Sequence, residues 1–178
     1  MKFFASVALA ALATSTPLKA TEDTTQLSFF NALSKLCGQR YEGKMTFPTE
    51  GQDSFSGKRL VATLDTCTDT QIRIPFHVGE DHSRTWIVSK TEHGLQLKHD
   101  HRHEDGTPDE INMYGGLAGN TGSALSQSFA ADNHTATIIP AATTNVWIMT
   151  LSEDTITYHL ERHNAPRFTA ELTKVGNK

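Results

Sequence analysis

This 178-residue sequence contains only two cysteines and has no excess of positive charge. The 16 lysines and arginines are outnumbered by 20 aspartates and glutamates, which gives a formal net charge of -4 at pH 7. A chain with this balance does not present the basic surface that attracts nucleic acids, so we expect no nucleic-acid partner. The sequence also contains no Gly-x-Ser-x-Gly elbow of the kind that carries a serine nucleophile.

No apolar run is long enough for a permanent membrane anchor, which needs about 20 residues. The longest run, Phe3 to Ala13, follows Lys2 and gives way to a polar segment. This order is typical of a secretory signal peptide, whereas a buried helix would show an amphipathic pattern. We predict cleavage after Ala20, with cleavage after Ala13 as the alternative, and a secreted or periplasmic protein. Residues 21–178 would then form one domain.

The two cysteines, Cys37 and Cys67, lie 30 residues apart. In an oxidising compartment a lone pair of cysteines is best interpreted as a disulfide. A reactive thiol would need a base or a metal beside it, and the sequence near each cysteine offers neither. We therefore predict a Cys37–Cys67 disulfide.

The spacing of apolar residues predicts one short helix followed by many strands. Leu27, Phe30, Leu33 and Leu36 recur at helical spacing, and Gly38 follows them, so a helix should end near Cys37. The later segments are short, rich in Val, Ile, Thr and aromatic residues, and separated by turn residues. These expected strands cover residues 41–47, 58–66, 70–78, 85–91, 94–103, 110–117, 123–130, 135–139, 145–151, 155–162 and 168–175.

Short polar turns join most of these segments, as expected for neighbouring antiparallel strands. A meander this long leaves two exposed edges unless it closes on itself. We therefore predict a mainly β fold, a single antiparallel up-and-down barrel of about eight to eleven strands with one N-terminal helix. A two-sheet β-sandwich is the alternative.

Two resemblances accompany this pattern. The run Leu33, Leu36, Gly38, Tyr41, Glu42 and Gly43 resembles the opening of calycin-type barrels such as lipocalins. Those barrels commonly carry Gly, one residue, then Trp at this point, whereas Tyr41 here stands three residues after Gly38. The resemblance implies that Arg162, on a late strand, packs over Tyr41. The segment from Ile72 through Tyr114 also resembles a family of secreted bacterial proteins with no established activity.

The segment 95–106 holds an unusual row of histidines. Counted with the period of a strand, Leu95, Leu97, His99, His101 and His103 share one face. The histidines thus continue an apolar face and should point toward the interior or its mouth. Asp100 and the other charged residues of the opposite face should be solvated.

The histidine row supports two interpretations. Two imidazoles at this spacing can reach one ion, so His99, His101 and His103 are candidate ligands of zinc or copper, and an open coordination position would permit hydrolysis. They can equally form the polar end of a hairpin and hydrogen-bond across strands.

The aromatic residues support two interpretations as well: Trp86 and Tyr114 can line a ligand cavity or fill a core. Our leading hypothesis is a barrel, not an enzyme, that binds a small apolar or amphipathic ligand near Trp86, His99, His101, His103 and Tyr114. A histidine-based metalloprotein or hydrolase is the second hypothesis, and a structural or partner-binding envelope protein is the third.

Overall fold

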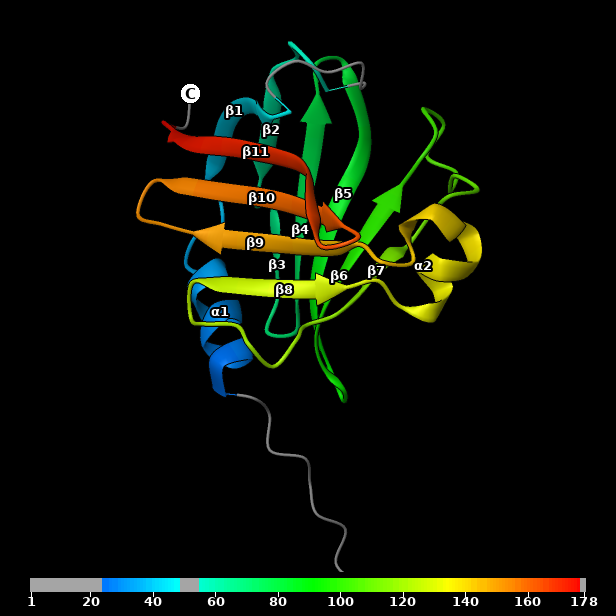
Figure 1. Ribbon diagram of the computed structural model, residues 1–178. Helices are drawn as coiled ribbons and strands as arrows, with labels where there is room; N and C mark the ends of the chain where they lie inside the picture. Colours follow the sequence, from blue (N-terminus) through cyan, green and yellow to red (C-terminus); the bar gives the residue numbers. More distant parts are fainter. Residues whose placement is uncertain (1–23, 49–54, 177–178) are drawn as a thin grey trace, which may run out of the picture.

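The computed structural model describes residues 24–48 and 55–176, so the predicted signal peptide at residues 1–20 lies outside the described residues. Strands dominate the fold, and two short helices and one 3-10 turn accompany them (Figure 1). The elements in chain order are α1 (Thr24–Ser34), β1 (Arg40–Phe47), β2 (Leu60–Thr63), β3 (Thr66–Cys67), β4 (Gln71–Val78), β5 (Asp81–Thr91), β6 (Gly94–His101), β7 (Tyr114–Leu117), β8 (Ser126–Ala130), α2 (Asn133–Ile138), η1 (Pro140–Ala142), β9 (Val146–Leu151), β10 (Thr155–Arg162) and β11 (Ala165–Val175).

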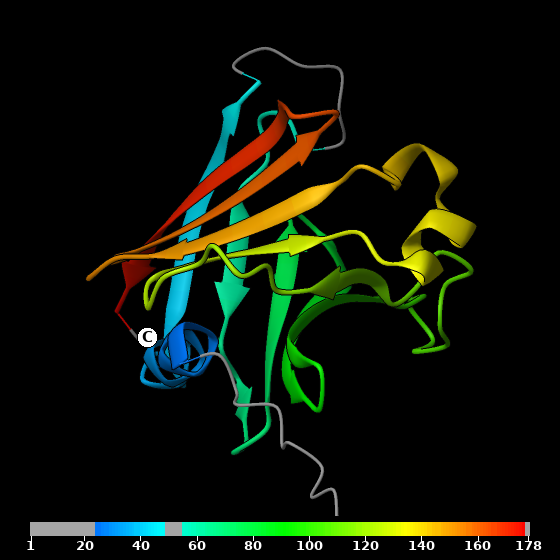
Figure 2. The same cartoon turned by 60° about the horizontal axis from the view of Figure 1, so that its bottom comes forward.

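All the strands belong to one antiparallel sheet, with the order β7-β6-β5-β4-β2-β1-β11-β10-β9-β8 and with β3 beside β4. Most neighbours in space are also neighbours in the chain, as the predicted meander requires. The pairing of β1 with β11 joins the two ends of the chain within the sheet. The sheet curls into a nearly closed barrel, in which the strands β8 to β11 cross over β4 and β5 (Figures 1 and 2).

The barrel closes along the seam between β7 and β8. An isolated bridge pairs Ala118 with Phe129, and the backbone N–H of Gly119 donates to the carbonyl of Ser128 at 2.8 Å. The seam is so tight that a Cβ on Gly116 would lie 1.8 Å from the carbonyl oxygen of Ala130, so only glycine fits there. The single sheet, nearly closed at this seam, confirms the predicted barrel rather than the two-sheet sandwich.

Helix α1 lies at one end of the barrel, where it packs against β6 and β8 (Figure 2). Its apolar side buries Phe29, Phe30 and Leu33 in the core. The buried side chain of Gln26 accepts a hydrogen bond of 2.7 Å from the backbone N–H of Leu95, which ties the helix to the start of β6. The predicted N-terminal helix is therefore confirmed.

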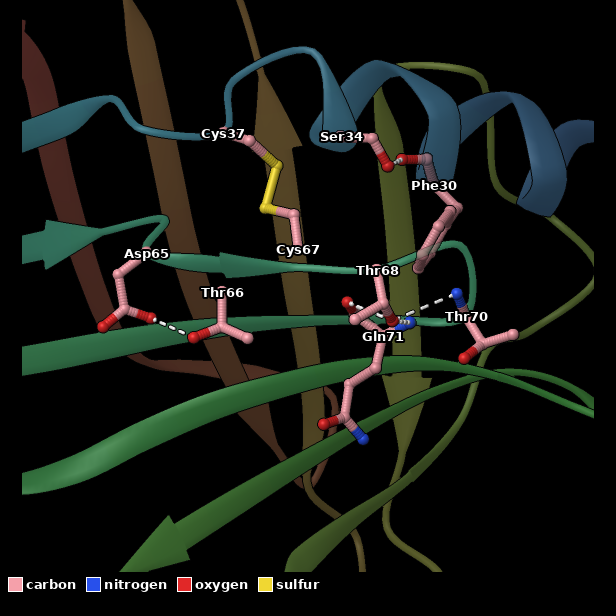
Figure 3. The surroundings of a disulfide bond; sticks show 9 residues. All are labelled: Phe30, Ser34, Cys37, Asp65, Thr66, Cys67, Thr68, Thr70 and Gln71. Carbon is pink, nitrogen blue, oxygen red and sulfur yellow. Dashed lines mark hydrogen bonds between the residues drawn. A yellow bond between two sulfur atoms is a disulfide. The ribbon is translucent and has the colours of Figure 1, made fainter.

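The predicted disulfide is also present, with 6.3 Å between the Cα atoms of Cys37 and Cys67 (Figure 3). The bond joins the segment after α1 to β3, a strand of two residues. The single strand expected at residues 58–66 is divided into β2 and β3, because the chain leaves the β2 pairing after Thr63.

The prediction of a strand at residues 135–139 is wrong. Residues 135–138 belong to helix α2, and Ile139 is the residue that ends it. The side chain of Asp132 caps this helix and accepts a hydrogen bond from the backbone N–H of Thr135 at 2.9 Å. The hydroxyl of Thr135 is buried and bonds both the carbonyl and the N–H of Gly115, which fixes α2 against β7. The cap and this tertiary anchor outweigh the strand preference of the threonine and isoleucine residues.

Candidate functional site

A cavity of about 270 Å³ opens inside the barrel. Its walls are mostly aromatic, and the segment after α2 contributes Ile139 and Ala142. The lining residues are Phe55, Phe76, Arg84, Trp86, His99, Tyr114, Ile139, Ala142, Asn145, Trp147, Tyr158, Leu160, Arg162, Arg167 and Phe168. Its volume lies just below the roughly 300–1,000 Å³ of sites for drug-sized molecules, so it suits a small ring system.

The strand period decides which side chains reach this cavity. On β4 the fully buried residues alternate with half-buried ones, and Phe76 belongs to the inward set. Cross-strand pairing then places Trp86 of β5 beside His99 of β6. Across the barrel, Trp147 of β9 and Tyr158 of β10 are inward residues of the same kind.

The aromatic walls are stacked against one another. The ring of Trp86 lies between Phe76 and Tyr158, with centroid distances of 4.2 Å on both sides. On the next strand, the ring of His99 stacks on Tyr114 at 4.5 Å. Because each ring is held by its neighbour, these walls are preorganised rather than loosely filled.

His99 is buried and hydrogen-bonded at both ring nitrogens. Its Nδ1 lies 3.0 Å from the carbonyl oxygen of Tyr114, which can only accept, so Nδ1 carries the proton and donates. Nε2 is then the acceptor for the hydroxyl of Tyr158. Burial lowers the pKa of His99 to about 3 and raises the pKa of Tyr158 well above its ordinary value, so the pair is neutral at physiological pH.

A second histidine–tyrosine contact lies beside the first. The Nε2 of His101 is 3.0 Å from the hydroxyl of Tyr114. Burial raises the pKa of Tyr114 to about 12, while burial and the charge of Arg84 lower the pKa of His101. The polar groups of this wall thus form a neutral network.

The structure separates the five residues predicted to bind a ligand. Trp86, His99 and Tyr114 line the cavity. His101 contacts the hydroxyl of Tyr114 but is not among the lining residues, and His103 is exposed beyond the end of β6. The predicted alternation is correct at His99, but the inward face ends before His103 because β6 ends at His101.

The same separation bears on the predicted zinc or copper site. Among residues 24–48 and 55–176, no group of three or more His, Cys, Asp and Glu side chains is placed to hold a metal ion. A metal at His99 would have to displace the carbonyl of Tyr114 or the hydroxyl of Tyr158. The hydrogen-bonded interpretation therefore describes the geometry of His99 and His101, whereas His103 is exposed.

The prediction that Asp100 is solvated is wrong, since this residue is only 2% exposed. Two guanidinium groups cover its carboxylate: Nη2 of Arg73 lies 2.9 Å from Oδ2, and Nε of Arg102 lies 3.0 Å from Oδ1. An outward-facing carboxylate can thus be buried when long cationic side chains fold over it.

Three arginines line the cavity, and only one of them has a carboxylate partner among the described residues. Nη1 of Arg84 lies 2.6 Å from Oδ2 of Asp81. Nε of Arg162 donates to the buried Asn145 at 2.8 Å. In the described part of the chain, Arg167 has neither a side-chain hydrogen bond nor an ion pair, and it is exposed.

The expected packing of Arg162 over Tyr41 is wrong. Tyr41 pairs with Lys174, beside the start of β10, whereas Arg162 is the last residue of that strand. The eight residues of β10 span about 25 Å, which keeps the two side chains apart. Tyr41 is instead a fully buried core residue.

Sequence reasoning did not identify Tyr158 or the cavity arginines as site residues. For Tyr158 and Arg162, however, the sequence contained a recognisable pattern. Ile156, Tyr158, Leu160 and Arg162 alternate along β10, so they share one face in the same way as the leucines and His99 on β6. An arginine that ends an apolar face is thus a marker of a cavity mouth here.

Comparisons with protein-family models, with curated proteins and with solved structures found no match. Within the described ranges, neither helix has the length and apolar character needed to cross a membrane.

Proposed function

We propose that this protein binds one small apolar or amphipathic ligand inside its barrel, outside the cytoplasm. The observation that carries the proposal is the 270 Å³ cavity with stacked aromatic walls. A concave, largely apolar pocket with a few converging polar groups is the usual form of a small-molecule site. The predicted signal peptide and the disulfide support this compartment, because disulfides persist where the environment is oxidising.

The barrel fold is compatible with the same proposal, since a barrel can hold a small ligand in its interior. Fold alone is a weak basis for function, so the proposal depends on the site. The neutral histidine–tyrosine network adds hydrogen-bonding groups that orient a ligand without adding charge. We therefore assign the site to binding and not to catalysis.

The chain provides its own optical reporter. It contains two tryptophans, Trp86 and Trp147, and both line the cavity. We expect the neutral dye N-phenyl-1-naphthylamine to bind saturably at one site. Excitation of the tryptophans should then raise dye emission while tryptophan emission falls, because donor and acceptor are in contact.

A matched pair of variants locates the dye. Ala142 lines the cavity, so Ala142→Leu should fill part of it and weaken dye binding by about tenfold or more. Its neighbour Ala141 is exposed, and Ala141→Leu should bind as the wild type does. Saturable binding that is equal in both variants would place the dye elsewhere and contradict the proposal.

A further inference from the structure

We infer that the ligand carries a carboxylate on a planar apolar body, and that Arg162 and Arg167 bind this carboxylate at the cavity mouth. The inference rests on the proposed function and adds the chemical class of the ligand. It comes from the charges around the cavity, not from the shape of the fold.

The cavity wall is positive in a protein whose net charge is negative. Three arginines line it, and among the described residues 24–48 and 55–176 no aspartate or glutamate does. An arginine stays charged in any protein environment, so this set attracts anions and repels cations. His99 adds no charge, because burial lowers the pKa of its imidazole to about 3.

The three arginines differ in how much of each guanidinium is free. Arg84 is neutralised by Asp81 and also lies over the ring of Phe55, at 5.4 Å from its centroid. Nε of Arg162 donates a hydrogen bond to Oδ1 of Asn145, and the two terminal nitrogens of Arg162 have no hydrogen-bond partner among the described residues. Arg167 has no such partner either, so Arg162 and Arg167 are the groups able to bind a ligand anion.

Arg162 and Arg167 lie at the opening of the cavity and not deep inside it. Arg162 ends β10, Arg167 lies near the start of β11, and the two-residue turn His163–Asn164 joins these strands. Arg167 is exposed although it lines the cavity, so the cavity reaches solvent on its side. A ligand would place its apolar body between the aromatic walls and leave its charged end at this turn.

A carboxylate suits this site better than other polar groups. The planar guanidinium presents paired N–H donors that match the two oxygens of a carboxylate. The small volume of the cavity, about 270 Å³, and its aromatic lining favour a flat ring system over a bulky one. A cationic ligand would gain contacts with the same rings but would be repelled by the arginines.

The test compares three probes of nearly equal shape: 2-naphthoate, 2-naphthamide and 2-naphthylmethylammonium. We expect calorimetric titration at low salt and pH 7.5 to show that the naphthoate binds about tenfold tighter than the neutral amide. The ammonium probe should bind weakest. Raising the salt concentration should reduce the preference, because the mouth is exposed to solvent.

Arg167→Gln should reduce the preference for naphthoate over the amide to about threefold or less. This variant is the cleanest one, because the side chain holds no partner in the described structure. Lys174→Gln removes the same charge from an exposed position on the same strand and should change neither affinity.

Each result separates the two proposals. Equal binding of naphthoate and amide, or a preference that survives Arg167→Gln, would overturn the inference of a carboxylate ligand and leave the binding function standing. Failure of all three probes, together with failure of the neutral dye, would remove the binding function itself.

Discussion

Lowering the pH from 6.5 to 3.5 should reduce the free energy of unfolding by several kcal/mol, and His99 should account for about 4 kcal/mol of this loss. The imidazole stays neutral in the folded protein because burial lowers the pKa of His99 from 6.5 to about 3. The unfolded chain takes up a proton below pH 6.5, and the folded protein does not. Stability is therefore fully present above pH 6.5 and is lost as the pH falls toward 3.

This loss of stability in acid has a structural reason: the neutral ring of His99 makes two hydrogen bonds. Protonation of Nε2 would remove the acceptor for the hydroxyl of Tyr158 and place a charge in the aromatic wall. The neutral tautomer satisfies both neighbours, whereas the charged ring would have no acidic partner among the lining residues that the structure describes. The acid sensitivity and the binding site thus share one residue.

Urea unfolding at a series of pH values between 6.5 and 4.5 measures this effect with least interference from carboxylates. His99→Gln should lower the slope of unfolding free energy against pH by about 1.4 kcal/mol per pH unit, the contribution of one proton. His103→Gln removes an exposed imidazole just beyond the same strand and should keep the wild-type slope. Equal slopes in the wild type and His99→Gln would contradict the assignment of a neutral, buried His99.

Removal of the disulfide should cost about 3.5 kcal/mol, by the loop-closure entropy of a 30-residue separation. The bond fastens the end of α1 to β3, which is otherwise a two-residue strand beside β4. The turn after Cys67 is ordered by Thr68, whose hydroxyl accepts from the backbone N–H of Gln71 at 3.0 Å (Figure 3). The hydrogen bonds of this turn do not involve the disulfide, so we expect the turn to persist after reduction and the loss to come mainly from the freed unfolded chain.

The double variant Cys37→Ala and Cys67→Ala should melt about 10 °C below the wild type in a thermal scan. Both cysteines are half-buried, so a thiol reductant should reach them. The reductant should lower the melting temperature of the wild type toward that of the variant and leave the variant unchanged. A reduced wild type that melts as the oxidised protein does would show that the bond adds no stability.

Periodicity predicted the parts of this fold that depend on neighbours in the sequence. The inward position of His99 and the burial of Ile72, Ile74 and Phe76 follow directly from alternation along a strand. Helix α2 was missed because a single cap, Asp132, outweighed a run of β-branched residues. Its capping position was readable in the sequence, but its anchor on Gly115 was not.

The candidate site was only partly predictable for a different reason. Trp86 and Tyr114 were expected near a ligand, yet Tyr158, which stacks on Trp86 from across the barrel, comes from a strand far along the chain. Which strands face one another depends on barrel closure, which short-range patterns do not encode. Asp100 shows the same limit, because its burial depends on Arg73, from a strand that does not adjoin β6.

The claim that the barrel cavity is a ligand site is tested most directly by a crystal structure of the protein with 2-naphthoate. We predict ring density within about 4 Å of Trp86 and Trp147, and a carboxylate within hydrogen-bonding distance of Arg162 or Arg167. Clear density for the cavity walls with no ligand between them, at a saturating concentration of naphthoate, would contradict the account.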